Sequence, residues 1–222
     1  MDESSDLDVA RLYGHRFTDQ DLRFKAAMWK VLCQGFFQRW VSQSDTVVDL
    51  GAGTCEFINA IRCQEKIAVD INPDVAAHAR EARVVIAPST DLSPISAESV
   101  DVVFCSNFFE HLLSKDVVIQ TLHECGRILR LGGILMVLQP NIRYLPGRYW
   151  DYFDHHTPLT HLSMAEALHL AGFVPEKIVP RFLPYTVKGT RPRLLPALRL
   201  YLRLPILWPL FGRQMFIVAK KG

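Results

Sequence analysis

The sequence feature that most constrains the fold is a short apolar run that ends in two glycines, VVDLGAGTCEF at residues 47–57. β-branched residues in front of a glycine turn predict a buried strand over residues 46–50. The residues that follow, 57–62, predict a helix. Such a turn lets the backbone approach a ligand closely and directs the first N–H groups of the helix toward it. The pattern therefore predicts a ligand site at the carboxyl end of a buried strand.

The rest of the chain repeats the alternation of strand and helix. Helices are expected at 18–41, 73–83, 117–129 and 163–171, the last one capped by Ser163 with Glu166 and stopped by Gly172. Strands are expected at 66–70, 84–87, 100–105 and 133–138, and near 177–182 and 215–219. Alternating strands and helices indicate a doubly wound α/β domain, a parallel sheet with helices on both faces. Neither a repeat nor a linker interrupts the pattern, so a single domain is expected over residues 1–222.

Composition narrows the class of protein further. With 222 residues, 49% of them hydrophobic, the chain can bury a full core without disulfides or metals. The five cysteines are odd in number and form no C-x-x-C pair, so they argue against a zinc ribbon and suit a reducing interior. The acidic start MDESSDLDVA has no apolar core of a signal peptide, and no run of about 20 apolar residues predicts a membrane span. A cytoplasmic location is expected.

Two acidic residues specify which ligand the glycine turn would hold. Asp70 closes the second strand, 17 residues after Gly53, where a carboxylate can accept both ribose hydroxyls of an adenosine. A nicotinamide-binding Rossmann unit shares that pair. However, Asp49 precedes the glycines, and the third Rossmann glycine is missing near Phe57. A carboxylate at Asp49 would repel a pyrophosphate, whereas it favours the sulfonium or amino group of S-adenosylmethionine.

Five motifs in order, VVDLGAGTCEF, VDINPD, PSTDL, DVVFCSNFFEHL and LRLGGILMVLQPN, resemble the motif series of class I S-adenosylmethionine-dependent methyltransferases of the methyltransferase domain 11/23 type. The resemblance covers roughly residues 45–173, and the two late strands extend it to the C-terminus. It implies a Rossmann-like seven-stranded sheet, mostly parallel, with the last strand antiparallel and the ligand across the carboxyl ends of the strands. Cys55 departs from the family by standing where many members have a third glycine, and we expect adjustment of the turn rather than loss of binding.

The resemblance also implies a division of the chain and a set of cofactor contacts. It implies an N-terminal helical cap (1–44), a cofactor-binding core (45–185), a basic amphipathic insertion (186–212) and a last strand (213–222). Contacts to S-adenosylmethionine are implied for the amino-acid part (Asp49, Gly51, Ala52, Gly53), the ribose (Asp70), the adenine (Ile71, Asn72, Thr90, Asp91, Leu92) and the sulfonium (Ser106, Asn107).

Candidate catalytic residues are three histidines in two segments after predicted strands. Residues 107–111 read NFFEH, which is not the N/D-P-P-Y/F motif of nucleic-acid and protein-glutamine N-methyltransferases, and His111 ends the segment. The long segment 141–161 carries His155, His156 and His161 among aromatic and basic residues. A histidine near neutrality can remove a proton from an acceptor hydroxyl, so His111, His155 and His156 are candidate bases. Adjacent histidines diverge in an extended chain, so we expect no metal site and different roles for His155 and His156. These residues can equally serve to hold the loop together.

The C-terminal segment from Lys177 to Gly222 holds ten of the 25 basic residues and none of the 23 acidic ones. Within 191–208, Arg193, Arg199 and Arg203 share one side of a helical wheel, and the opposite side is apolar (Leu195, Leu198, Tyr201, Leu202). This segment predicts either peripheral membrane contact and an anionic or lipid-linked acceptor, or a packed lid with its arginines in water. Nucleic acid is not expected as a partner, because leucines rather than stacking aromatics separate the arginines.

The sequence therefore predicts S-adenosylmethionine-dependent methyl transfer to a small-molecule or glycoconjugate acceptor, on oxygen. Two alternatives remain open at this stage: a non-catalytic module that keeps the cofactor pocket, and a nicotinamide-dependent oxidoreductase. The acceptor's identity and the oligomeric state are not predicted.

Overall fold

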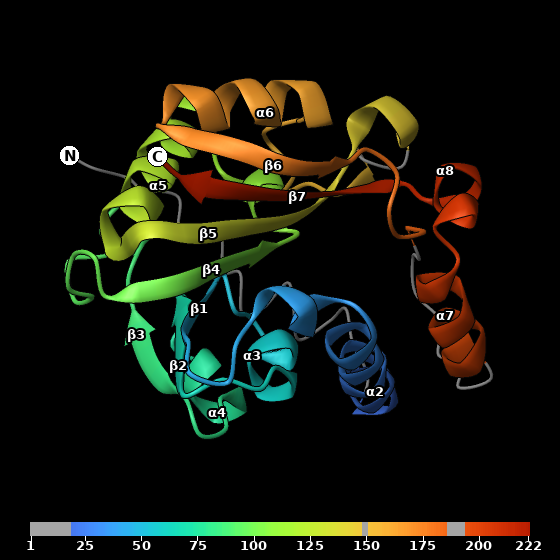
Figure 1. Cartoon of the computed structure of the whole chain (residues 1–222), viewed down its shortest axis with the longest axis horizontal. Helices are drawn as coiled ribbons and strands as arrows, with labels where there is room; N and C mark the ends of the chain where they lie inside the picture. The colour runs from blue at the N-terminus through green and yellow to red at the C-terminus, as the bar shows by residue number, and fades with distance from the viewer. Residues whose placement is uncertain (1–18, 148–150, 186–193) are drawn as a thin grey trace.

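The computed structural model describes residues 19–147, 151–185 and 194–222, and within them seven strands form one sheet in the order β3-β2-β1-β4-β5-β7-β6 (Figure 1). The strands are β1 (Thr46–Leu50), β2 (Glu65–Asp70), β3 (Arg83–Ile86), β4 (Val100–Ser106), β5 (Leu129–Pro140), β6 (Phe173–Val179) and β7 (Gln214–Lys221). The pairs β3-β2, β2-β1, β1-β4 and β4-β5 are parallel, whereas β7 runs antiparallel to both β5 and β6. The expected α/β sheet with an antiparallel last strand is confirmed.

Helices cover both faces of the sheet. The α-helices are α2 (Asp19–Gly35), α3 (Glu56–Ala60), α4 (Val75–His78), α5 (Lys115–Ile128), α6 (His161–Leu170), α7 (Leu194–Arg203) and α8 (Trp208–Phe211). Short 3-10 helices are η1 (Phe37–Trp40), η2 (Phe109–His111), η3 (Ile142–Tyr144) and η5 (Pro205–Leu207). One apolar cluster joins α5 and α6 to the sheet, and a second joins α2, α3, α7 and α8 to its other face. Parallel strands buried on both faces explain the near-continuous apolar runs in the sequence.

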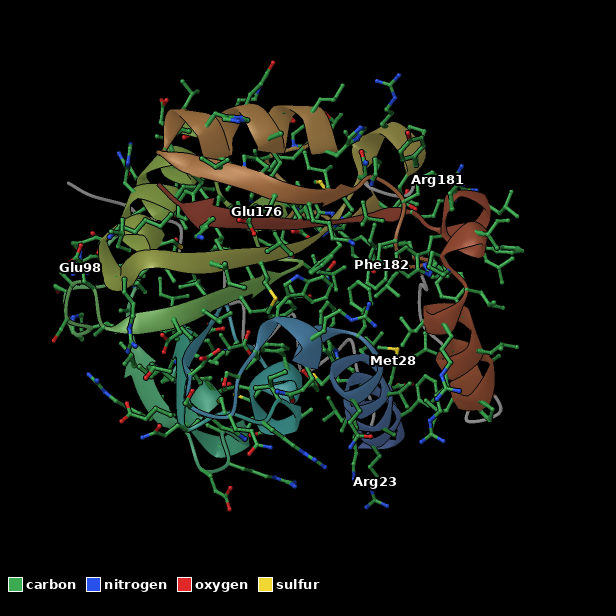
Figure 2. All side chains as sticks on the ribbon, in the orientation of Figure 1. Arg23, Met28, Glu98, Glu176, Arg181 and Phe182 are labelled. Atoms are coloured by element: carbon green, nitrogen blue, oxygen red, sulfur yellow. The ribbon has the colours of Figure 1, made fainter. Side chains whose placement is uncertain are left out.

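Aromatic rings fix the C-terminal helices to the N-terminal one. Phe36, which directly follows α2, packs against Phe182 (labelled in Figure 2), with ring centroids 4.2 Å apart. Trp208 of α8 approaches both rings edge-on, at 5.5 Å from Phe36 and 5.0 Å from Phe182. Offset and edge-on aromatic pairs add about 0.5–1.5 kcal/mol each beyond their area burial. This cluster closes one end of the molecule.

Several sequence predictions about element boundaries were wrong. The helix expected at 18–41 ends at Gly35, and the strand expected at 133–138 runs from Leu129 to Pro140. The helix expected at 73–83 spans only Val75–His78, because the side chain of Asn59 ends it: Nδ2 donates to His78 O at 2.9 Å, and Oδ1 accepts from Arg80 N at 2.8 Å. The N-cap of α6 is Thr160, whose Oγ1 accepts from Ser163 N, rather than Ser163 itself. The strand expected at 177–182 starts earlier, at Phe173. The stop at Gly172 is confirmed by its φ of +84°.

The expected basic insertion is partly described. Residues 194–211 form α7, η5 and α8, which lie together at one end of the molecule (Figure 1). The first residue of the helix expected at 18–41, residues 148–150 of the segment 141–161, and Arg193 lie outside the described residues. Across the described part of the chain, no helix has the length and apolarity needed to cross a membrane.

Candidate active site

The glycine turn after β1 adopts the backbone that the motif predicts. Gly51 has φ +72° and Gly53 has φ +50°, a region that favours glycine. A Cβ added to Gly51 would lie 2.3 Å from Cδ2 of Phe108, so the turn and the loop after β4 pack directly on one another. Cys55 keeps the left-handed conformation of the glycine that it replaces, with φ +61°, and is buried. The turn therefore adjusts to the missing third glycine at a single residue, Cys55, which holds a strained backbone conformation just before α3.

Asp70 ties this turn to the end of β2. Its Oδ2 accepts from Gly53 N at 2.8 Å, and its Oδ1 accepts from Asn72 N at 2.9 Å. Each carboxylate oxygen keeps a second lone pair for a ligand hydroxyl. Asp70 therefore lies where the ribose contact was expected, and it also holds the glycine turn in place.

Asp49 lies beneath the turn, with 4% of its surface exposed. Its Oδ2 accepts from Ile58 N in α3 at 3.3 Å. Burial raises the pKa of Asp49 to about 8, and the nearby carboxylates of Glu56 and Asp70 push it in the same direction. A cation bound beside Asp49 would favour the ionised form, so the group suits a positively charged ligand.

The residues expected around the adenine lie in the loops after β2 and β3. Ile71 leaves 65% of its surface exposed at the end of β2, where an apolar side chain can contact a flat base. Asp91 accepts from Ser93 N at 3.0 Å, and the hydrogen bonds with Ser93 lower its pKa. Leu92 is buried, and its N–H donates to Oε2 of Glu124 at 2.7 Å. The described positions of Asn72 and Thr90 are half-buried.

Ser106 and Asn107 end β4 next to the glycine turn. Asn107 has φ +49°, and its backbone N donates to Leu138 O of β5 at 2.8 Å. Its Oδ1 accepts from Nε2 of Gln214 at 2.7 Å, and its Nδ2 donates to Oγ of Ser106 at 3.2 Å. Asparagine tolerates a left-handed backbone better than most residues. The loop after β4 is therefore fixed from β5 and from the start of β7.

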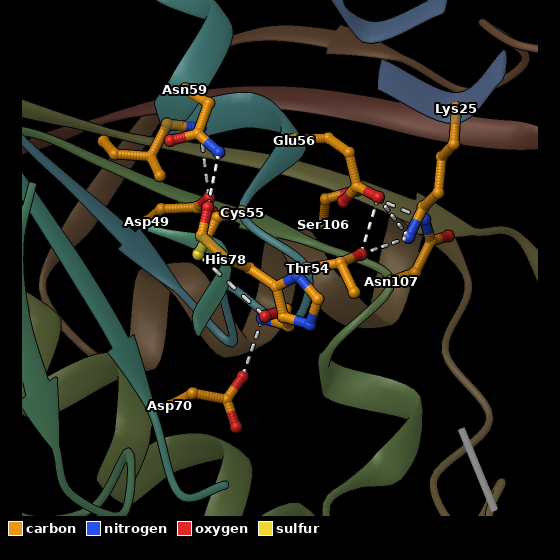
Figure 3. A network of polar contacts seen from close by, with 12 residues as sticks. Lys25, Asp49, Thr54, Cys55, Glu56, Asn59, Asp70, His78, Ser106 and Asn107 are labelled. Atoms are coloured by element: carbon orange, nitrogen blue, oxygen red, sulfur yellow. Dashed lines mark hydrogen bonds and ion pairs between the residues drawn. The ribbon is translucent and has the colours of Figure 1, made fainter. Parts of the chain in front are cut away.

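A lysine that the sequence analysis did not select reaches this turn from α2. Nζ of Lys25 donates to Oγ1 of Thr54 at 3.1 Å and pairs with Oε1 of Glu56 at 3.1 Å, and Thr54 donates to the same oxygen at 2.6 Å (Figure 3). Figure 3 shows this network on one side of Cys55 and Asp70 on the other. The contact attaches α2 to the glycine turn and places the positive charge of Lys25 where the turn meets α3.

A fully buried glutamate lies beyond the loop after β4. Glu110, in η2, has 1% of its surface exposed, and its Oε2 accepts from Nε2 of Gln139 at the end of β5 at 2.6 Å. Burial raises the pKa of Glu110, and neighbouring His111 opposes this effect. Among the described residues, Oε1 of Gln139 is the buried side-chain polar atom left without a hydrogen bond. The carboxyl ends of β4 and β5 thus hold a buried acid next to an imidazole.

His111 and His155 meet beside this acid. Nδ1 of His111 lies 3.2 Å from Oδ2 of Asp154 and 3.0 Å from its backbone oxygen. The two imidazole rings of His111 and His155 are 5.0 Å apart, at 78° to one another. Burial alone would lower the pKa of His111, but the hydrogen bond to Asp154 and the charge of Glu110 outweigh it and raise the pKa. The pair has the orientation of a base that a carboxylate holds in place.

The other histidines of the segment lie apart from this cluster. His156 is exposed, and its backbone N donates to Glu110 O at 2.8 Å. Thr157 N donates to the same oxygen at 3.1 Å. His161 begins α6 and contacts Asn141. Of the three candidate bases, the structure brings together His111 and His155 and leaves the His156 ring outside.

Metal binding is conceivable for one group of side chains in the described residues. Glu110, His111 and His155 each offer a ligand atom, and these atoms lie within 4.8 Å of one another. Ligand atoms of four-coordinate zinc lie about 3.3 Å apart for bonds of about 2.0 Å, which falls within that limit.

Sequence reasoning missed two parts of this site. It did not select Asp154 within the segment 141–161, although Asp154 orients His111 from 43 positions away. It did not select Lys25, which lies 29 positions from Thr54. The local sequence shows only that Lys25 lies on the helix before the glycine motif and that Glu56 lies in the first turn after it. Neither position indicates that the two side chains pair.

Comparisons with known proteins agree with this geometry. Residues 48–137 match the family model described as "Methyltransferase domain". A Mycobacterium tuberculosis protein named "Probable S-adenosylmethionine-dependent methyltransferase" is 35% identical over 136 residues, which cover 58% of this chain and 48% of the relative. The chain spans about half the length of the curated relatives that it matches.

Solved structures show the same fold. A S-adenosylmethionine-dependent methyltransferase from Archaeoglobus fulgidus superposes with a TM-score of 0.63 at 21% identity, covering 86% of this chain and 92% of that one. A Haloferax volcanii protein named "putative methyltransferase", solved in complex with the Trm112 methyltransferase activator, superposes with a TM-score of 0.66 at 20% identity, covering 87% of this chain and 90% of that one.

The domain match identifies a methyltransferase domain over residues 48–137, and the relatives and the shared sheet agree with the class I S-adenosylmethionine-dependent type. Its cofactor is S-adenosylmethionine, not a nicotinamide. The residues present fit that cofactor, because the turn at Gly51 admits no side chain and the buried carboxyl of Asp49 would be stabilised in its charged form by a cation.

Proposed function

We propose that this methyltransferase domain methylates an oxygen atom of a small-molecule or glycoconjugate acceptor. The observation that carries the proposal is the His111–Asp154 pair, held beside buried Glu110 at the carboxyl ends of β4 and β5. Loops at these strand ends face the ligand in doubly wound folds. An amine acceptor that binds unprotonated needs no base of this kind, whereas a hydroxyl gains from one.

We propose the following cofactor contacts for the same domain. The amino-acid part would lie against the turn (Asp49, Gly51, Ala52, Gly53), the ribose against Asp70, the adenine among the loops after β2 and β3 (Ile71, Asn72, Thr90, Asp91, Leu92) and the sulfonium near Ser106 and Asn107. Support comes from their positions around the carboxyl ends of β1, β2, β3 and β4. The bound cofactor supplies an electrophilic methyl group.

His111 would act as the base. Its Nδ1 faces Asp154, so Nε2 is the atom that would accept the proton of the acceptor hydroxyl. His155, packed against the His111 ring, would contact the acceptor, and His156 would hold the loop from outside. Alignment of the two reactants and exclusion of water supply the remaining catalysis.

Charge supports an anionic or lipid-linked acceptor. No acidic residue occurs from Lys177 to Gly222, and Arg181, Arg199, Arg203 and Arg213 belong to the described part of this segment. An excess of one charge raises the local concentration of ligands of the opposite charge. We also propose a cytoplasmic location, supported by five free cysteines, four of them buried.

A methyl-transfer assay tests the proposed function. S-adenosylhomocysteine formation would be followed with acceptor panels of alcohols, sugars, carboxylates and amines. We expect turnover with a hydroxylated acceptor and a loss of about 10²–10⁴-fold in His111→Ala with unchanged cofactor affinity. His169→Ala, at an exposed histidine on α6, is the matched control.

Other results of the same assay contradict the proposal. Turnover with amines alone would refute the oxygen target. Full activity of His111→Ala with a carboxylate acceptor would show that no base is used, and exposed Arg143 would then be the candidate to bind the charge. Cofactor binding without turnover on any acceptor would favour the non-catalytic module.

A further inference from the structure

The apolar face of α7 that the sequence predicts is already covered. Leu202 is 3% exposed, and Leu195, Leu198 and Tyr201 are half-buried against the cluster that contains α2. A Cβ added to Gly35 of α2 would lie 3.1 Å from Cδ1 of Leu202. This face is a packed lid, so it is not available to a membrane or a partner.

A second apolar surface lies on the outer side of the same segment. Five large side chains within twelve residues are exposed: Leu200 by 60%, Leu204 by 38%, Ile206 by 78%, Leu210 by 63% and Phe211 by 57%. Pro205 and Pro209 between them are exposed as well. We call these seven residues the outer rim. Single exposed apolar residues are ordinary on protein surfaces, but several large ones within twelve residues mark a candidate interaction site.

The backbone holds the outer rim rigidly in this exposed position. Nε of Arg181 donates to Gly212 O at 2.9 Å, and its Nη2 donates to Leu210 O at 3.0 Å; Figure 2 labels Arg181 beside α8. The indole of Trp208 is buried and donates to Tyr201 O at 3.0 Å. Turning the apolar side chains inward would break these contacts, so exposure is a property of the fold here.

Charge around the outer rim has one sign. Exposed Arg199 and Arg203 stand on the same outer side of α7 as Leu200, and exposed Arg213 follows α8. The whole segment from Lys177 onward contains no acidic residue. Apolar side chains on a segment whose own charged residues are all cationic complement a surface that is anionic outside and hydrocarbon beneath.

The outer rim also lies at the end of the domain that carries the proposed active site. α7 and α8 connect β6 to β7, at the end of the molecule where β4, β5 and β6 finish (Figure 1). A hollow of about 240 Å³ separates α8 from Tyr144 of η3, the first turn of the segment that carries His155. A surface bound at the outer rim would therefore lie at the same end of the sheet as the proposed acceptor site.

We propose that the outer rim binds an anionic lipid bilayer. Ile206, Leu210 and Phe211 enter the headgroup region, and Arg199, Arg203 and Arg213 contact anionic headgroups. The inference deepens the proposed function by giving a lipid-linked acceptor a route to the site. Only this statement about the acceptor rests on the proposed function. Binding to the bilayer itself needs neither cofactor nor acceptor.

Vesicle binding by the whole protein tests this inference. The probes are vesicles of phosphatidylcholine alone and of phosphatidylcholine with phosphatidylglycerol, and the readout is the protein that sediments with them. We expect binding to the anionic vesicles and at least tenfold weaker binding for the double variant Ile206→Glu with Leu210→Glu. The matched control is Leu131→Glu with Leu170→Glu, two leucines that are 77% and 75% exposed elsewhere. Arg199→Gln with Arg203→Gln should weaken binding to anionic vesicles several-fold.

Three outcomes overturn the inference: absence of wild-type binding, equal losses in test and control variants, or a wild-type dimer that the Ile206 and Leu210 changes dissociate. The last result would assign the outer rim to a second copy of the chain. Methylation of a water-soluble acceptor separates this inference from the proposed function. Vesicle binding without any methyl transfer refutes only the proposed function. Methyl transfer without vesicle binding refutes only the proposal that the outer rim binds a bilayer.

Discussion

His111 faces Asp154 with a single ring atom, Nδ1, which contacts both a carboxylate oxygen at 3.2 Å and the backbone oxygen at 3.0 Å. Both partners are acceptors, so Nδ1 carries the hydrogen. The neutral imidazole then has its lone pair on Nε2. The geometry fixes the tautomer as well as the ring orientation, and this arrangement makes the pH behaviour of the site predictable.

The rate of hydroxyl methylation should fall as the pH decreases through a midpoint above 6.5. Only neutral imidazole accepts a proton, and Asp154 and Glu110 together raise the pKa of His111 against the lowering effect of burial. Asp154→Asn should move this midpoint downward and reduce kcat. A pH profile of kcat for both proteins checks the prediction, and an unchanged midpoint in the variant would contradict the assignment of His111.

Asp49→Asn should weaken S-adenosylmethionine more than it weakens adenosine. The cationic end of the cofactor favours an ionised carboxylate, and the variant removes that charge while the adenosine contacts remain. Affinity of the wild type should increase as the pH rises through the Asp49 pKa of about 8. Calorimetry with both ligands at several pH values provides the measurement. Equal losses for the two ligands would mean that Asp49 is structural.

The same residue should affect stability in the absence of cofactor. The pKa of Asp49 is raised from 3.8 to about 8 on folding, so between these values the folded chain holds a proton that the unfolded chain releases. The contribution of Asp49 to the free energy of unfolding is therefore lost as the pH rises toward 8. Asp49→Asn should lose less stability than the wild type between pH 5 and pH 8, as urea unfolding at both pH values would show. A parallel decline in the two proteins contradicts the raised pKa.

Asp70→Ala should weaken cofactor binding by about 2–3 kcal/mol, the range for charge-assisted hydrogen bonds. It should also lower the unfolding temperature, because Asp70 accepts from the backbone of both Gly53 and Asn72. Asp74→Ala, an exposed aspartate four residues further on, serves as the control. Unchanged affinity in a folded Asp70→Ala protein would remove the ribose role.

Gly51→Ala should abolish cofactor binding and destabilise the fold by roughly 1–3 kcal/mol. The new Cβ would lie 2.3 Å from the Phe108 ring, at a φ of +72° that side-chain-bearing residues rarely adopt. Adding Phe108→Ala should recover part of the stability, because it relieves the contact and leaves the backbone strain. Gly147→Ala, where a Cβ meets open space, should change little. Thermal unfolding of the three variants and the wild type decides the point.

Treatment with a chelator such as EDTA should leave turnover unchanged if His111 acts as a base. Glu110, His111 and His155 are the described residues that could hold an ion together. Assay after chelation, with elemental analysis of the purified protein, separates the two roles. Loss of activity that zinc restores would assign the cluster to a metal and refute the expectation of a metal-free site.

The parts of the fold that could be predicted are those encoded by local sequence patterns. The strand over 46–50 ends where expected, because an apolar run and a glycine turn are both encoded within eleven residues. The helix expected over 73–83 failed because a side chain from another helix, Asn59, takes the hydrogen bonds that would extend it. Propensity within a window contains no information about such a partner.

The candidate site divides in the same way. The cofactor residues follow strands and could be selected from motif order. The pairs Lys25–Thr54 and His111–Asp154 join segments 29 and 43 positions apart, so only the folded chain brings them together. The divergence of His155 and His156 was predictable, because neighbours in an extended chain point to opposite sides.

The segment that carries His155 is attached to Glu110 through main-chain N–H groups, those of His156 and Thr157. Every amino acid except proline offers the same donor. Exposed side chains along this segment can therefore be exchanged without breaking these main-chain contacts. A library that varies exposed residues such as Phe153 and His156 while keeping His111, Asp154 and Glu110 could change which acceptor is chosen and leave the proton chemistry in place.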